Sequence, residues 1–159
     1  MSEPQENNTL DMEAIKLGSE INADDVVETL TFLDDWEDRY RYIIDLGKQL
    51  PAFPADMQTE SRLVRGCQSQ VWLETRYDPD ADRLQLAVDS DALIVRGLAA
   101  IVLAALNGKS PRDVVNYDME GYFGQIDLLR HLSPIRGNGL RAMVQRIRDT
   151  AAVYVSAGE

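Results

Sequence analysis

Cysteine and histidine are almost absent from this chain, which has one of each among its 159 residues. A single cysteine excludes a disulfide within the chain, and with it a secreted scaffold built on disulfides. Metal and iron–sulfur sites need several cysteine, histidine or carboxylate ligands, and thiolate-bound clusters generally take four. We therefore expect no metal and no cofactor of the chain's own. A free thiol is typical of a reducing compartment, so we expect a cytoplasmic protein.

Long hydrophobic runs are also missing. The most apolar run, residues 98–106, has about half of the ~20 apolar residues that a membrane-spanning helix needs. Residues 1–8 are polar and acidic, without the apolar segment of a secretory signal. The sequence thus predicts neither a membrane span nor a secretory signal. Its length favours one domain with a single core.

Positive charge is scarce at one end of the chain. The net charge is -11, and residues 1–38 hold twelve acidic side chains and one basic side chain. The remaining residues carry fifteen of each sign. Nucleic-acid binding needs a basic face, so that function is disfavoured. We predict an acidic, flexible arm over residues 1–22 and a single domain over residues 23–159. The arm either only solvates the chain or steers a basic partner.

Helical spacing of apolar residues predicts two helices near the start of the domain. Asn22 or Asp24 can cap a first helix that ends near Leu33. A second helix should begin near Asp35 and end before Pro51, since proline cannot continue a helix.

Further helices are predicted in the second half of the chain. Residues 92–106 are apolar nearly all round and should form the central, most buried helix, capped by residues 89–91. One or two short helices are expected over residues 118–132. Proline and glycine indicate a loop at residues 134–139. The last helix should follow over residues 140–155, with three basic side chains facing outward: Arg141, Arg146 and Arg148.

A β region separates the two groups of helices. Apolar and polar residues alternate over residues 71–77 and 83–88, which predicts an antiparallel hairpin. Residues 61–64 are expected to add a third strand. The predicted fold class is therefore α+β, in two layers, with a three-stranded antiparallel sheet packed by helices on one face.

The only cysteine, Cys67, lies in a polar stretch between two predicted strands. Gly66 and Ser69 are typical turn residues, so the thiol should lie at the tip of a loop. An accessible thiol near positive charge can ionise and react, and Arg62 and Arg65 are close enough in sequence to supply that charge. The alternative is an inert structural cysteine, although a core cysteine is expected to interrupt an apolar run.

The run GCQSQVWL around the cysteine resembles the signature of the SufE family, the sulfur-acceptor proteins that work with cysteine desulfurases. Three further blocks resemble the family, and all four occur in family order. WEDRYRYII, from residue 36, is similar to its first helix. DSDALIVRGL, from residue 89, is similar to the start of its central helix. HLSPIRGNGL, from residue 131, is similar to the segment before its last helix.

The resemblance implies a fold similar to that of the iron–sulfur scaffold protein IscU. It also implies that Cys67 takes persulfide sulfur from a cysteine desulfurase, stimulates that enzyme and passes the sulfur to an iron–sulfur assembly scaffold. Pyridoxal phosphate would belong to the partner desulfurase, which would be SufS- or CsdA-like. The chain would then be an activator and not an enzyme, and it could act as a homodimer.

The resemblance also implies supporting roles for residues around the thiol. Each role has a structural alternative, such as turn chemistry, helix capping or bracing of a loop. These residues are Gly66, Gln68, Ser69, Asp91 and Arg136, and Arg65 is added as a supporting residue because of its charge near the thiol.

Three other functions stay open. A CsdE-type acceptor would serve a different desulfurase and a different sulfur destination. A cysteine hydrolase would use Cys67 as nucleophile and His131 as base, although one distant histidine is a weak signal. A pure interaction module would work equally well with Cys67→Ser.

Overall fold

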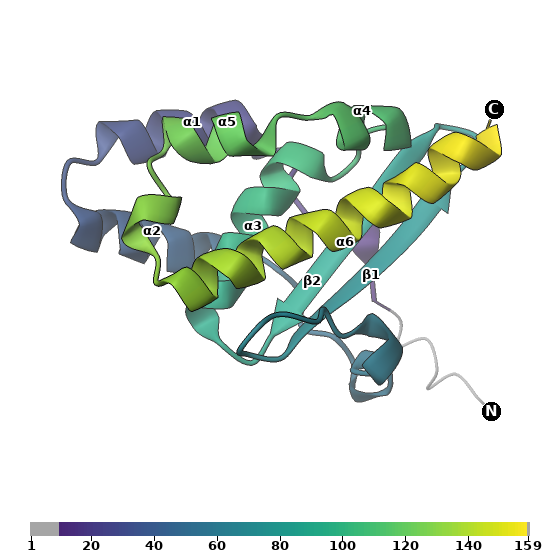
Figure 1. Ribbon diagram of the computed structural model, residues 1–159, viewed down its shortest axis with the longest axis horizontal. Coiled ribbons are helices and arrows are strands. Elements are labelled where there is room, and N and C mark those ends of the chain that lie inside the picture. Colours follow the sequence, from purple (N-terminus) through teal and green to yellow (C-terminus); the bar gives the residue numbers. More distant parts are fainter. Residues whose placement is uncertain (1–9, 159) are drawn as a thin grey trace.

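The computed structural model describes residues 10–158. A two-stranded sheet and the helix α3 form the middle of the molecule, and the long helix α6 crosses in front of them (Figure 1). The elements, with η denoting short 3₁₀ helices, follow in this order: η2 (Met12–Ala14), α1 (Ala23–Phe32), α2 (Trp36–Gly47), η3 (Ala55–Met57), η4 (Glu60–Arg62), β1 (Val71–Asp78), β2 (Arg83–Ser90), α3 (Leu93–Leu106), α4 (Pro111–Asn116), α5 (Met119–Gln125), η5 (Leu129–His131) and α6 (Pro134–Gly158).

The first two helices begin where the sequence predicts. The Asn22 side chain accepts a hydrogen bond from the N–H of Asp25, and the Asp25 carboxylate accepts one from the N–H of Asn22, both over 3.0 Å. This reciprocal pair satisfies two backbone donors at the start of α1. Asp35 caps α2 in a simpler way, by accepting a hydrogen bond from the N–H of Glu37.

The predicted hairpin is confirmed. β1 and β2 run antiparallel, from Val71 opposite Ser90 to Asp78 opposite Arg83. Asp82 in the turn has a φ of 50°, in the left-handed region that short polar residues tolerate. Helices and an antiparallel sheet together confirm the α+β class.

The predicted third strand is wrong, because the sheet has two strands. The segment before the cysteine forms the turn η4, and only Leu63 makes an isolated bridge to Trp72 of β1. The guanidinium of Arg146 on α6 donates hydrogen bonds to the carbonyl oxygens of Leu63 and Ser61. These bonds attach the segment to α6, while Leu63 and Val64 remain bonded to β1.

α3 is the most buried helix, as predicted, and residues 97–106 are all buried. α2 crosses it closely because both helices carry a glycine at the crossing. A Cβ atom on Gly47 would lie 2.5 Å from the backbone nitrogen of Gly97. A Cβ atom on Gly97 would lie 2.3 Å from the carbonyl oxygen of Ile43. The backbones therefore meet where a side chain would not fit.

The residues predicted to cap α3 have other partners. The N-cap position is Ala92, which makes no side-chain cap hydrogen bond. Asp89 is buried at the end of β2, where its carboxylate accepts a hydrogen bond from the N–H of Phe53 over 2.8 Å and lies 3.4 Å from Arg96. Asp91 binds the loop that carries the cysteine. The polar cluster before α3 therefore joins separate parts of the chain.

The last helix starts earlier than predicted. It begins at Pro134, so Gly137 and Gly139 lie inside α6 and not in a loop. Proline is well suited to the first position of a helix, since its fixed φ is helical and no backbone donor is lost there. The hydroxyl of Ser133 accepts a hydrogen bond from the N–H of Arg136, which satisfies a donor of the first turn.

Two of the three α6 arginines that were predicted to face outward bind backbone instead. Arg146 holds the segment before the cysteine, and Arg148 donates to the carbonyl oxygen of Tyr117. Only Arg141 keeps to the surface, where it pairs with Glu120. α6 is therefore attached to its neighbours by hydrogen bonds from arginine side chains as well as by its buried apolar side chains.

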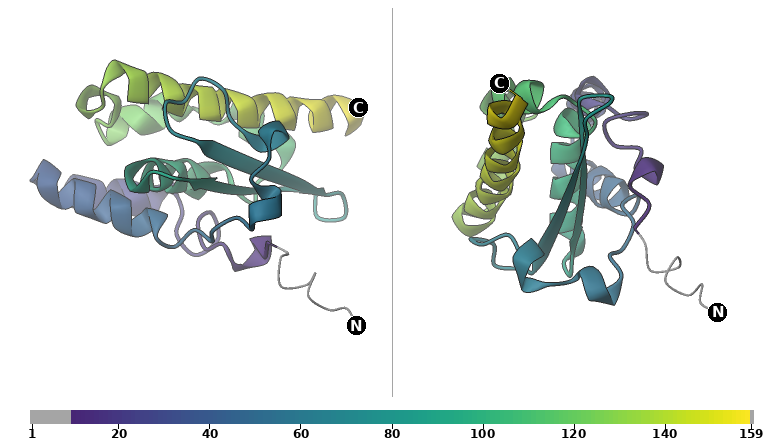
Figure 2. Two further views of the ribbon diagram at one scale, coloured as in Figure 1. Left: turned by 90° about the horizontal axis from the view of Figure 1, so that it is seen from below. Right: turned by 90° about the vertical axis from the view of Figure 1, so that its right-hand side faces the viewer.

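Helices cover both sides of the central layer, which differs from the predicted packing on one face. Figure 2 shows the sheet and α3 as a central layer. α6 lies on one side of this layer, and α1, α2 and the N-terminal segment lie on the other side. Leu10, Met12, Ile15 and Leu17 of that segment are buried. This packing differs from the flexible arm predicted for residues 1–22, because the apolar side chains from residue 10 onward turn into the core. Residues 1–9 lie outside the described residues.

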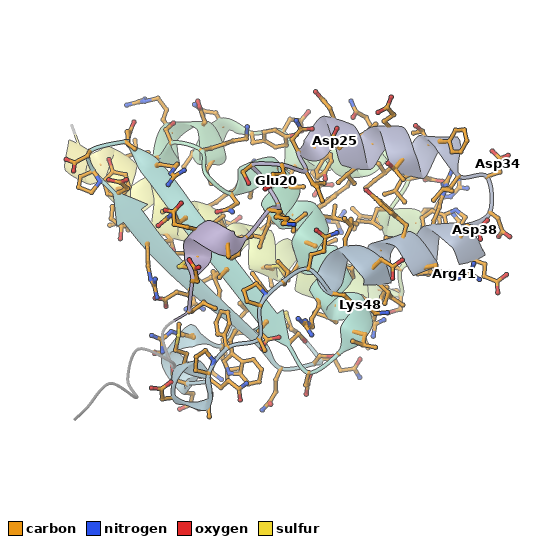
Figure 3. The ribbon with its side chains drawn as sticks, turned by 180° about the vertical axis from the view of Figure 1, so that it is seen from behind. Glu20, Asp25, Asp34, Asp38, Arg41 and Lys48 are labelled. Carbon is orange, nitrogen blue, oxygen red and sulfur yellow. The ribbon has the colours of Figure 1, made fainter. Side chains whose placement is uncertain are left out.

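The acidic side chains near the start of the chain lie on folded helices. Figure 3 shows Asp25 on α1, Asp34 in the connection to α2 and Asp38 on α2, on the side of the molecule turned away from α6. Arg41 neutralises part of this face by pairing with Asp38 over 3.3 Å. The predicted excess of negative charge thus belongs in part to the domain itself.

Candidate functional site

Cys67 lies in the loop between η4 and β1 and is half-buried. Gly66, directly before it, has a φ of 93°, a conformation that favours glycine. The thiol donates a hydrogen bond to the carbonyl oxygen of Gly139 in α6, with 3.4 Å between sulfur and oxygen. A Cβ atom on Gly139 would lie 3.4 Å from the sulfur, an ordinary van der Waals distance, so the thiol lies directly against this part of α6.

A pocket opens beside the sulfur atom, between the loop, α3 and α6. It is an open hollow, and the empty space of about 370 Å³ within it includes bulk solvent at its mouth. Ile135 stands at the pocket and is 56% exposed, so part of this apolar wall faces outward. There is room beside the sulfur for a further small group. The lining residues outside the loop are mostly apolar: Val95, Leu98, Ile135, Arg136, Gly139, Leu140 and Met143.

Burial raises the pKa of the Cys67 thiol above its usual range, because the apolar surroundings disfavour the thiolate. Arg62 and Arg65 were expected to supply positive charge to the thiol, but both pair with carboxylates. Arg65 pairs with Glu60 over 3.7 Å at the surface. Arg62 binds the carboxylate of Glu74 over 2.8 Å. The resting thiol is therefore protonated at neutral pH.

Three other predicted site residues lie beside the cysteine. Gln68 and Ser69 follow it in the loop and line the same pocket, and Arg136 reaches the pocket from α6. In the described part of the chain, Arg136 is the only charged side chain of that lining. Its positive charge attracts anionic groups that approach the pocket.

Asp91 holds the far end of the loop. Its carboxylate accepts a hydrogen bond from the N–H of Gln70 over 3.2 Å, and its own N–H donates to the carbonyl oxygen of Gln70 over 3.3 Å. The structure therefore gives this aspartate a role in loop attachment, where sequence alone also allowed helix capping.

His131 lies elsewhere and does not line the pocket of Cys67. Its ring stacks on Trp36 with 3.7 Å between the ring centroids, and its Nε2 is 3.5 Å from the carboxylate of Asp127. Its carbonyl oxygen accepts a hydrogen bond from the hydroxyl of Tyr40. The histidine therefore joins η5 to α2, which leaves a cysteine hydrolase without its expected base.

The apolar residues that line the pocket were not predicted from the sequence as part of the site. Leu98, Leu140 and Met143 recur at helical spacing and are typical core residues by that pattern. Only the packing of α3 against α6 turns them toward the thiol. The one usable signal was the Ser-Pro start of α6, which places Gly139 inside a helix.

Metal and membrane features are also limited by the structure. Between residues 10 and 158, no group of three or more histidine, cysteine, aspartate or glutamate side chains is arranged to hold a metal ion. No helix in the same range is both long enough and apolar enough to cross a membrane.

Fold and site together define a small α+β protein built around one loop-borne thiol that rests against an apolar pocket. The model of the family described as "SufE: Fe-S metabolism associated domain" matches residues 24–151. The chain belongs to the SufE family, which confirms the resemblance seen in the sequence. Membership connects the chain with iron–sulfur metabolism.

Two relatives are similar over most of their length. An uncharacterised SufE-like protein of Rhizobium meliloti (strain 1021) is 48% identical over 132 residues, which cover 82% of this chain and 94% of the relative. An uncharacterised SufE-like protein of Rhizobium etli is also 48% identical, over 138 residues, which cover 86% of this chain and 93% of the relative.

A solved structure shows the same fold. The solution structure of a hypothetical protein from Thermus thermophilus matches with a TM-score of 0.69, over 84% of this chain and 96% of that chain. The two sequences are 20% identical, so the similarity concerns the fold alone.

Proposed function

We propose that this protein accepts persulfide sulfur on Cys67 from a pyridoxal-phosphate cysteine desulfurase, stimulates that enzyme and passes the sulfur on to iron–sulfur cluster assembly. The observation that carries the proposal is the position of the thiol: it lies in a loop, held by one long hydrogen bond, beside a pocket with room for another atom. Family membership supplies the context of iron–sulfur metabolism.

The transfer step is an exchange at sulfur. The Cys67 thiol first loses its proton, and its thiolate then attacks the outer sulfur of the persulfide on the donor's cysteine. The donor's sulfur–sulfur bond breaks, its cysteine leaves as a thiolate, and Cys67 now carries the persulfide. No net oxidation takes place. Removing the persulfide frees the donor for another turnover, which accounts for the stimulation.

Binding of the partner has to precede this step. In the pocket the thiol is protonated and only half accessible, so the loop must move for an in-line attack. Ile135, which lines the pocket and is 56% exposed, offers an apolar contact surface at the site. A desulfurase that covers this side chain would lie next to the pocket that holds the thiol.

The test is a transfer assay followed by intact mass. The protein is mixed with a cysteine desulfurase and free cysteine, and its mass is measured before and after reduction. We expect wild type to gain sulfur that a thiol reductant removes, and Cys67→Ser to gain none. His131→Asn should transfer like wild type, whereas a hydrolase would depend on that histidine.

The contrary outcome is equally clear. If Cys67→Ser still stimulates the desulfurase and wild type gains no mass, the protein is an interaction module. Repeating the assay with SufS- and CsdA-like desulfurases separates a SufE-type acceptor from a CsdE-type acceptor.

A further inference from the structure

The loop that carries the thiol is held at two stems. At the leaving stem, Gln70 and Asp91 exchange two hydrogen bonds. At the entering stem, the N–H of Val64 donates to a carbonyl of β1 over 2.8 Å, and the Val64 side chain is buried. Residues 65–69, the crest of the loop, lie between these attachments.

One stripe of α6 faces this whole loop. Gly139 receives the hydrogen bond from the thiol, and Ala142 packs against Gly66. Met143 lines the pocket, and Arg146 binds the entering stem. Residues at i, i+3, i+4 and i+7 lie on one side of a helix. These are Gly139, Ala142, Met143 and Arg146.

Arg146 makes the strongest contacts of that stripe. Its Nη1 donates to the carbonyl oxygen of Leu63 over 2.9 Å, and its Nη2 donates to that of Ser61 over 2.8 Å. A charged donor forms stronger hydrogen bonds than a neutral one, and a thiol is a weak donor. The stem is therefore attached to α6 more firmly than the crest, which depends on the 3.4 Å contact of the thiol.

We propose that Arg146 is a positioning residue for Cys67: it fixes the entering stem on α6, confines opening to the crest, and thereby sets how often the thiol leaves its pocket. The inference rests on the proposed function, in which opening precedes sulfur transfer. Without the guanidinium, the stem keeps its bond to β1 but loses both hydrogen bonds to α6, so that stem and crest can move away from α6 together. The thiol then spends more time in solvent.

The test measures alkylation of Cys67 by iodoacetamide across a range of pH, without any desulfurase. The rate at high pH, where the thiol is ionised, reports how often the loop is open, and the midpoint of the profile reports the pKa of the thiol. We expect Arg146→Ala to raise the high-pH rate by about tenfold, the scale of losing a charge-assisted hydrogen bond. Its midpoint should fall toward the usual range of a thiol.

Two variants serve as comparisons. Arg146→Lys should give an intermediate rate, because one ammonium cannot span both carbonyls as the planar guanidinium does. Arg141→Ala removes the same charge from the same helix but only breaks the surface pair with Glu120, so its profile should match wild type. If Arg146→Ala does not fold, as judged by circular dichroism, Arg146→Lys and Arg146→Gln take its place, and both should label faster than wild type.

The inference is overturned if the folded Arg146 variants lose thermal stability while their rate and midpoint stay at the wild-type values. Arg146 would then stabilise the fold and nothing more. Because the measurement uses no partner, it can succeed when sulfur transfer fails, and it can fail when sulfur transfer succeeds.

Discussion

At the scale of single residues, the protonation of Cys67 is the property that decides the chemistry. Its surroundings keep the proton on the sulfur, because burial disfavours the thiolate and the neighbouring arginines have carboxylate partners of their own. A thiol that is protonated and half-buried is slow to oxidise, since oxidation follows thiolate character and exposure. The resting site therefore favours protection over reactivity.

The raised pKa makes stability depend on pH in one direction. Between the usual thiol pKa and the higher folded value, the folded chain binds a proton that the unfolded chain has lost. The contribution of the thiol is complete below the usual value and disappears as the pH rises through the folded value. We expect the free energy of unfolding of wild type, relative to Cys67→Ala, to start falling near the usual thiol pKa of about 8.5 and to fall further as the pH rises, in urea titrations.

Tyr122 is the obvious complication of that measurement. Burial raises its pKa as well, and this also lowers stability at high pH. Since Tyr122 is present in both proteins, its effect cancels in the difference. A difference that does not change with pH would show that the thiol is as solvated in the folded chain as in the unfolded one.

Sequence reasoning succeeded at this scale where the cause is local. Gly66 and the polar neighbours of Cys67 predict a loop because turn chemistry acts over a few residues. The expectation that Arg62 supplies positive charge to the thiol was not met, for the opposite reason. Arg62 is close to the cysteine in sequence, but its partner Glu74 comes from β1, and only the fold brings the two together.

At the scale of elements, α2 and α3 cross with their backbones in close contact at Gly47 and Gly97. Gly97→Ala would place a methyl group 2.3 Å from the carbonyl oxygen of Ile43, so the two helices must move apart. We expect a loss of about 1–3 kcal/mol or more in the free energy of unfolding, as for other overpacked cores. Thermal and urea unfolding would measure it.

Gly124 offers the matched control. It also lies in a helix, α5, but a Cβ atom built on it meets no other atom within 4 Å. Gly124→Ala should be neutral or should stabilise the protein by up to about 1 kcal/mol, since alanine favours a helix over glycine. Equal effects of the two substitutions would mean that helix propensity alone matters and that the crossing is not tight.

Whole elements were predicted well when their own sequence determines them. Asn22 with Asp25 forms a complete capping box, so the start of α1 could be read directly. The predictions of a third strand and of a loop over residues 134–139 were wrong, the second because the two glycines outweighed the local Ser-Pro signal for a helix start. The segment before the loop forms η4 and receives hydrogen bonds from Arg146, and Gly137 and Gly139, which are typical helix breakers, lie inside α6.

At the scale of the whole molecule, the segment before α1 is part of the domain core. Leu17 is fully buried, and its carbonyl oxygen accepts a hydrogen bond from the side chain of Asn107 at the end of α3. Its neighbour Lys16 is exposed. Substitutions at these two positions therefore test whether the segment is packed into the core or forms a flexible arm.

We expect Leu17→Ala to lower the free energy of unfolding by about 2–5 kcal/mol, the usual cost of removing a buried leucine side chain. Lys16→Ala should change it by less than about 0.5 kcal/mol. Urea unfolding of both variants beside wild type would measure the effects. A leucine variant as stable as the lysine variant would support the flexible arm.

The assembled site is the part that sequence could not supply. Its pocket needs the loop, α3 and α6 at once, and each contributes side chains that look like ordinary turn or core residues. The family resemblance identified the cysteine, but the pocket around it forms only where the loop, α3 and α6 come together in the fold.

The placement of the two tryptophans gives the molecule a built-in optical probe. Trp72 pairs with Leu63 at the foot of the loop, whereas Trp36 stacks on His131. Replacing Trp36 with phenylalanine would leave a single indole fluorophore, next to the segment that has to lift. Changes in its emission could then time each opening in stopped-flow experiments, with no dye attached to the sulfur whose freedom is being followed.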